Sequence, residues 1–111
     1  MDKGNGMKCK IEIEISEDVL ECAFEGARAN YWIKGWDEVD GMIYVLDRYD
    51  ESDHVLALTD KRLQKGVELL ADHYPNQFRY LMVEDWKDYQ GDAETGNLLV
   101  QLSLFGSVQY G

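Results

Sequence analysis

The residue types that carry out most enzyme chemistry are sparse in this sequence and poorly spaced for it. Ser52, Asp53 and His54 stand side by side, which unites the three side-chain types of a hydrolase triad. Adjacent side chains of an extended segment point to opposite faces, however, and a triad requires three side chains that converge in space. We therefore expect no nucleophilic catalysis from this tripeptide.

Metal and phosphate chemistry have equally little support. The sequence has two histidines and two cysteines, and none of them shows zinc-ligand spacing. Cys9 and Cys22 fall on predicted apolar faces, which is typical of reduced core thiols in a cytoplasmic protein. The stretch "GNG" follows no predicted strand, so it does not match a phosphate-binding loop. We predict no metal ion, no cofactor and no enzymatic activity.

The charge of the chain favours a basic partner. Its 111 residues include 22 acidic and 11 basic side chains, for a formal net charge of −11. Such a surface should repel nucleic acid and anionic lipid, because both are bound mainly through Lys and Arg. It suits a basic protein, or it serves only solubility. No apolar run reaches the roughly 18 residues of a membrane span and no signal peptide is apparent, so we expect a cytoplasmic location.

Hydrophobic periodicity predicts one α+β domain over residues 8–111, after a flexible start at 1–7. Residues 8–16 alternate apolar and charged side chains, as a half-buried strand does. An amphipathic helix follows over 17–29, with Ser16 as its N-cap. Residues 41–49 and 54–59 are expected to form an antiparallel hairpin.

Two further helices are predicted in the second half of the chain. The first covers 60–74, is capped by Thr59 and ends at Pro75, and the second covers 92–106 and ends at Gly106. The stretch between them, 76–86, fits either a short helix or an irregular segment. The expected order is β-α-β-β-α-α, a small, mostly antiparallel three-stranded sheet with helices packed on one face.

Acidic side chains recur along the first predicted helix and the strand before it. The helix repeats glutamate every four residues, although like charges at that spacing repel by about 0.2–0.5 kcal/mol per pair. This surface either occupies a basic groove on a partner or is simply solvated. Its members are Glu12, Glu14, Glu17, Asp18, Glu21 and Glu25.

The aromatic segment "NYWIKGW" is the second candidate for partner binding. Trp32 and Trp36 share a face whether the segment is a strand or a helix. Tyr and Trp dominate interface hot spots because they bury much apolar area and keep a polar group. The alternative is that both indoles pack in the core beneath the sheet.

The final predicted helix is apolar on almost every side, with a thin polar line of Glu94, Asn97 and Gln101. A surface helix shows a broader polar face, so we expect this one to be central to the fold or half-covered by a second copy of the chain. The amides need partners, because an unpaired buried amide costs about 1–3 kcal/mol. Asn97 and Gln101 either satisfy backbone groups of nearby loops or, with Arg28, line a ligand pocket or a dimer seam. Gly96 either admits a neighbouring backbone or is merely tolerated.

Short motifs near both ends of the chain resemble a family of small acidic proteins of tailed phages and prophages. Members start a helix with an "ISDD"-like motif, continue to "EGG" and "YW", and end on "DA.TAD..LQ.ALFGE..YG". Ala27 replaces the second glycine of that pattern, and Gly96-Asn97 replaces Ala-Asp, which removes a carboxylate. The matching pieces are Ile15-Ser16-Glu17-Asp18, Glu25-Gly26, Tyr31-Trp32, Asp92-Ala93-Glu94-Thr95, Gln101, Phe105-Gly106 and Tyr110-Gly111.

The resemblance implies a phage or prophage origin and no particular reaction. Small acidic phage proteins often inhibit nucleases or CRISPR effectors. Our leading hypothesis is therefore a non-enzymatic anti-defence protein, for example an anti-CRISPR, whose acidic surface binds a basic groove of a host defence protein. One alternative is a sponge for a nucleotide immune signal, held by Trp32, Trp36 and Arg28 with Asn97 and Gln101. Another is a structural or assembly protein of the virion.

Overall fold

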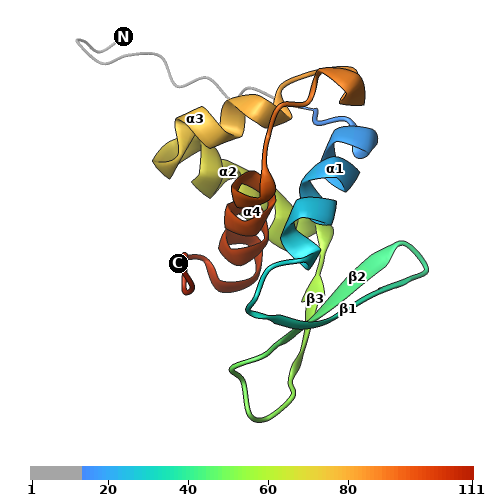
Figure 1. Ribbon diagram of the computed structural model, residues 1–111, viewed down its shortest axis with the longest axis vertical. Helices are drawn as coiled ribbons and strands as arrows, with labels where there is room; N and C mark the ends of the chain where they lie inside the picture. The colour runs from blue at the N-terminus through green and yellow to red at the C-terminus, as the bar shows by residue number, and fades with distance from the viewer. Residues whose placement is uncertain (1–13) are drawn as a thin grey trace, which may run out of the picture.

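Helix α4 (Ala93–Phe105) lies at the centre of the protein, in a computed structural model that describes residues 14–111 (Figure 1). Nine consecutive residues of this helix, 95–103, are buried. Helices α1 (Glu17–Arg28) and α2 (Asp60–His73) both pack against it. The expectation that the last helix is central to the fold is therefore confirmed.

The three long helices enclose an apolar core. Its buried members are Val19, Ala23, Leu70, Leu81, Leu98, Leu99 and Leu102. Two glycines allow the helices to approach closely. A Cβ atom added at Gly96 would lie less than 3.0 Å from the carbonyl oxygen of Ala23, and one added at Gly66 would lie less than 3.0 Å from Ser103. Real Cβ atoms essentially never come this close to another atom. The hypothesis that Gly96 admits a neighbouring backbone is confirmed.

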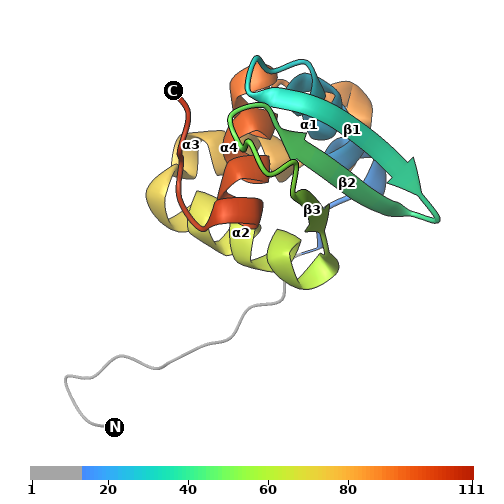
Figure 2. The same ribbon diagram turned by 90° about the horizontal axis from the view of Figure 1, so that it is seen from below.

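A three-stranded antiparallel sheet packs beside the helices. Strands β1 (Ile33–Val39), β2 (Met42–Asp47) and β3 (Val55–Leu58) pair in the order β1-β2-β3. Figure 2 shows the helices gathered on one side of this sheet. The α+β class and the antiparallel pairing of the two strands predicted within 41–59 are confirmed.

The order of the elements differs from the predicted one. The described chain runs α-β-β-β-α-α-α rather than β-α-β-β-α-α. Most of the strand predicted over 8–16, like the flexible start predicted over 1–7, lies outside the described residues. The last three residues of that strand, 14–16, are not in a strand. The third strand of the sheet is β1 instead.

Periodicity misses β1 because the alternation of this strand is broken. It carries charged side chains at Lys34, Asp37 and Glu38. A register shift between Ile33 and Gly35 also interrupts its pairing with β2. Both features remove the period of two by which a strand is recognised in a sequence.

The two faces of the sheet differ in what covers them. The inner face packs on α1 and α4 through a second apolar cluster, whose buried members are Ala27, Trp32, Ile33, Val45 and Val100. Alternation places a set of mostly apolar side chains on the outer face, where Val39 and Val55 are exposed. The other members of this outer set are Gly35, Asp37, Met42, Tyr44, Leu46 and Ala57.

The predicted helix ends are largely confirmed. Thr59 Oγ1 accepts a hydrogen bond from Arg62 N at 3.2 Å, which caps α2. Asp92 Oδ1 accepts from Glu94 N at 3.0 Å at the start of α4, and Gly106 ends that helix with a φ of 74°. Ser16 precedes α1, but its side chain makes no capping hydrogen bond.

The stretch between α2 and α4 combines short helical turns with irregular backbone. It contains α3 (Pro75–Phe78) and two 3-10 turns, η1 (Arg79–Leu81) and η2 (Trp86–Asp88). Both 3-10 turns contact α1, so this segment forms one wall beside that helix. Among residues 14–111, no helix combines the length and the apolar character needed to cross a membrane.

Candidate functional site

Acidic side chains line the exposed side of α1. The helix buries Val19, Ala23 and Ala27, which recur every four residues and so lie on one side. Its first-turn carboxylates also interact favourably with the helix dipole. Glu14 is exposed just before the helix, whereas Glu12 and Cys9 lie outside the described residues. The exposed carboxylates of the helix itself are Glu17, Asp18, Glu21 and Glu25.

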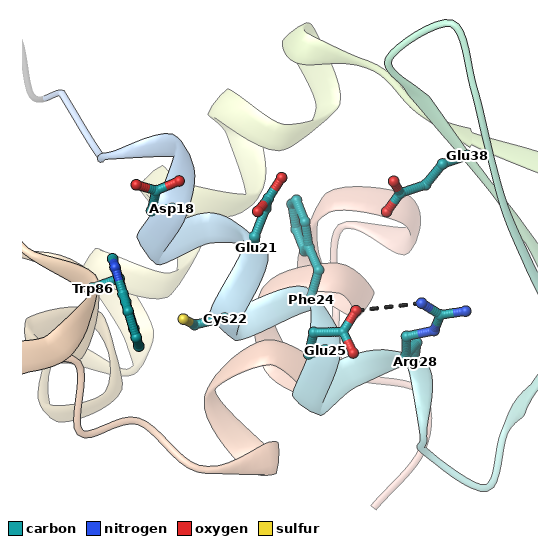
Figure 3. A pocket seen from close by; sticks show the side chains of 8 residues that line it. All are labelled: Asp18, Glu21, Cys22, Phe24, Glu25, Arg28, Glu38 and Trp86. Carbon is teal, nitrogen blue, oxygen red and sulfur yellow. Dashed lines mark hydrogen bonds and ion pairs between the residues drawn. The ribbon is translucent and has the colours of Figure 1, made fainter.

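A groove of about 510 Å³ runs beside this acidic side (Figure 3). It forms where α1 lies next to β1 and η2, which contribute Glu38 and Trp86. Four of its residues are carboxylates and one is basic, so the groove is electronegative. The residues that line it are Asp18, Glu21, Cys22, Phe24, Glu25, Arg28, Glu38 and Trp86.

Most carboxylates of the groove are without a counter-ion among the described residues. Arg28 Nη1 lies 3.3 Å from Glu25 Oε1, the ion pair drawn in Figure 3. Asp18, Glu21 and Glu38 form no ion pair with any of residues 14–111. Neighbouring carboxylates of one sign create a field that attracts cations into such a concave surface.

Trp86 is the large aromatic side chain of the groove, and sequence analysis does not single it out. Its side chain is 51% exposed on η2. It also borders a second hollow of about 440 Å³, together with Asp18, Glu84, Asp85 and Lys87. Its exposure could have been predicted from the charged run "EDWKD", because a tryptophan between charged residues is not expected to pack in a core.

Neither of the two tryptophans predicted to bind a partner is among the residues that line this groove. Trp32 is fully buried and stacks on Tyr110, with ring centroids 5.5 Å apart. Its indole N–H donates a hydrogen bond to Asn97 Oδ1 at 2.7 Å. Trp36 is half-buried with its ring centroid 6.1 Å from that of Phe24, and its indole nitrogen has no acceptor among residues 14–111. Trp32 thus packs in the core, which was the alternative interpretation, and presents no surface to a partner.

Asn97 and Gln101 form an internal hydrogen-bond network. Gln101 Nε2 donates to Asn97 Oδ1 at 2.8 Å and to the carbonyl oxygen of Tyr110 at 3.0 Å. Gln101 Oε1 accepts from the backbone N–H groups of Gln109 and Tyr110, both at 2.8 Å. Asn97 Nδ2 donates to Glu94 Oε1 at 3.1 Å. The two amides therefore hold the segment after α4 against the core, and neither lines one of the two hollows.

The ionisation of the Tyr110 hydroxyl group makes the free energy of unfolding depend on pH in the alkaline range. Its hydroxyl donates to Asp47 Oδ2 at 2.6 Å, and this hydrogen bond, aided by desolvation, raises the pKa of Tyr110 to about 12. A tyrosine in the unfolded chain ionises near pH 10. The unfolded chain therefore loses this proton first, and the free energy of unfolding should fall as the pH rises from about 10 to about 12.

Tyr110→Phe should remove this part of the pH dependence, because it has no proton to lose. Denaturant unfolding of both proteins at a series of alkaline pH values measures the effect. At pH 8 the variant should be less stable by about 1.5–3 kcal/mol, the range for a hydrogen bond to a charged group. The stability difference should shrink towards pH 12. A difference that stays constant over that range would contradict the expectation.

The tripeptide Ser52-Asp53-His54 lies in the connection between β2 and β3. Ser52 Oγ donates to Asp50 Oδ1 at 2.6 Å, and Asp53 Oδ1 accepts from Lys34 Nζ at 2.7 Å. The hydrogen bonds from Ser52 are the main cause that lowers the pKa of Asp50. Ser52 and Asp53 thus bond to separate neighbours. Within the described part of the chain, no group of three or more His, Cys, Asp or Glu side chains is placed to hold a metal ion.

Comparison with known proteins found no relative that shares this groove or this fold. No protein-family model matches the chain, and no match was found among curated proteins or solved structures. The groove and the acidic side of α1 are therefore interpreted from their own residues.

Proposed function

We propose that this protein is a non-enzymatic inhibitor of phage or prophage origin that binds a basic groove of a host defence protein, such as a CRISPR effector or another nuclease. The observation that carries the proposal is the electronegative surface of α1. Asp18, Glu21 and Glu38 lack a counter-ion among the described residues and border one groove. A surface lined by Lys and Arg complements such charge and is attracted to it over a distance.

A nucleic-acid-binding groove is the natural counterpart of this surface. Nucleases hold phosphates with Lys and Arg side chains, and a row of carboxylates competes for those same side chains. The described residues give less support to the nucleotide sponge, because most of the side chains assigned to it already have partners within the chain. Trp32, Asn97 and Gln101 bond to one another inside the core, while Arg28 pairs with Glu25 at the groove.

Reversing the charge of α1 tests this proposal. A variant with Glu17→Lys, Glu21→Lys and Glu25→Lys should fail to capture the defence protein from a lysate of defence-active cells and should fail to inhibit its nuclease activity. The melting temperature should be nearly unchanged, because exposed charges contribute little to stability. Mass spectrometry of the captured proteins and a nuclease assay are the two measurements.

A matched variant on α2 controls for net charge alone. Asp60→Lys, Glu68→Lys and Asp72→Lys alter the same number of exposed carboxylates on a different helix. This control should capture and inhibit like the wild type. Inhibition that survives the α1 reversal, or that is lost equally in the α2 control, would mean that α1 is not the binding surface.

A further inference from the structure

The groove beside α1 has one aromatic wall and several acidic ones. Figure 3 shows the indole of Trp86 beside Asp18 and Cys22, with Glu21 further along the same helix. The indole is 51% exposed. Phe24 and Cys22 are half-buried and add apolar surface between the carboxylates. This arrangement places a flat aromatic surface next to unpaired negative charge.

The two ends of the groove differ in whether a cation is already present. At one end, Arg28 lies next to Glu25, so a guanidinium of this chain already binds a carboxylate of the groove. At the other end, Trp86 and Asp18 lie together without a basic partner from residues 14–111 within ion-pair distance of the carboxylate. The second end therefore offers a place for a cation supplied from outside.

A guanidinium matches both kinds of wall better than an ammonium group does. It is planar and weakly hydrated, so it stacks on an indole, and it donates two parallel N–H groups to one carboxylate. A lysine ammonium is a compact, strongly hydrated charge that loses the stacking contact. We infer that this end of the groove receives an arginine side chain from a basic segment of the protein partner, with Trp86 as the stacking surface and Asp18 and Glu21 as acceptors. The inference rests on the proposed function, since it names the side chain by which the basic partner is recognised.

Calorimetric titration with a short, blocked oligo-arginine peptide tests the arginine site directly. The wild type should bind this peptide more tightly than an oligo-lysine peptide of equal length. Trp86→Ala should weaken oligo-arginine binding about tenfold, within the range of a partly desolvated cation–π contact, and should remove the preference for arginine. Trp86→Phe should retain part of that preference. The exposure of Trp86 means that these variants should keep the fold, which thermal unfolding verifies.

Carboxamide variants separate the groove from the overall charge. Asp18→Asn with Glu21→Gln should weaken binding of both peptides, whereas Glu68→Gln with Asp72→Asn on α2 removes the same charge and should have little effect. Equal affinity of the wild type and Trp86→Ala for oligo-arginine would overturn the arginine site. So would equal affinity of the wild type for the two peptides, or no binding of either.

Capture of the defence protein distinguishes this inference from the proposed function. If Trp86→Ala captures the partner as the wild type does while the α1 charge reversal abolishes capture, the arginine site is wrong and the acidic surface still acts. If neither variant affects capture, both proposals fail. Loss of capture in both variants supports both.

Discussion

Replacing Gly96 by alanine is expected to lower the free energy of unfolding by about 3 kcal/mol, the upper part of the range for overpacking a core. The added Cβ would collide with the carbonyl oxygen of Ala23 and come within 3.1 Å of the backbone nitrogen of Ala27. Both atoms belong to the backbone of α1, which cannot rotate away as a side chain can. The helices must therefore separate, and the contacts between α1 and α4 weaken along their length. The gain of about 1 kcal/mol in helix propensity is too small to compensate.

Thermal and denaturant unfolding measure this effect. A loss of about 3 kcal/mol corresponds to a fall of roughly 10–20 °C in melting temperature for a domain of this size. Gly111→Ala is the control, because nothing lies within 4 Å of the methyl group that it adds. The close approach of α1 and α4 would be wrong if Gly96→Ala melted at the same temperature as this control.

Replacing Gln101 by leucine should cost about 2–4 kcal/mol and release the segment after α4. Leucine fills a similar volume but makes none of the four hydrogen bonds that the buried amide makes. The backbone N–H groups of Gln109 and Tyr110 and the carbonyl oxygen of Tyr110 then lose their partner. Each unpaired buried group costs about 1–3 kcal/mol. Part of this cost is avoided if the segment moves into water. Hydrogen exchange should accordingly show fast exchange at the backbone N–H groups of Gln109 and Tyr110.

Gln109→Leu is the matched control for that prediction. It makes the same chemical change at an exposed side chain, which hydrogen-bonds only to Ser107 Oγ among the described residues. Its unfolding free energy and its exchange rates should stay close to those of the wild type. Slow exchange at Gln109 and Tyr110 in the Gln101→Leu protein would show that the amide does not hold this segment.

The helices could be predicted because the information for each lies within its own residues. Thr59 and Gly106 mark helix ends by local backbone chemistry, and the apolar spacing of α1 and α2 is regular. Strand β1 has no such local pattern, because charged residues and a register shift interrupt it, and its pairing with β2 decides its conformation. Its identity as the third strand therefore depends on a neighbour rather than on its own sequence.

The candidate site was predictable only in part for the same reason. The acidic side of α1 follows from helical spacing, so it could be located in advance. The groove could not, because its other walls come from β1 and η2, and periodicity does not place those segments beside α1. Trp32 was a candidate for partner binding, with core packing as the alternative. It is buried in the apolar cluster beneath the sheet, where its indole N–H bonds to Asn97, 65 residues further along the chain.

The central position of α4 has a consequence for synthesis of the protein on the ribosome. This helix follows every other helix and strand in the chain, and α1 and α2 each pack against it. During translation, α1, the sheet and α2 therefore emerge before the apolar surface that covers them. Residues such as Val19 and Leu70, which share a core with α4, stay uncovered until α4 has emerged from the ribosome. The contacts of α1 and α2 with α4 can therefore form only after α4 has emerged from the ribosome, so the acidic side of α1 gains its support late in folding.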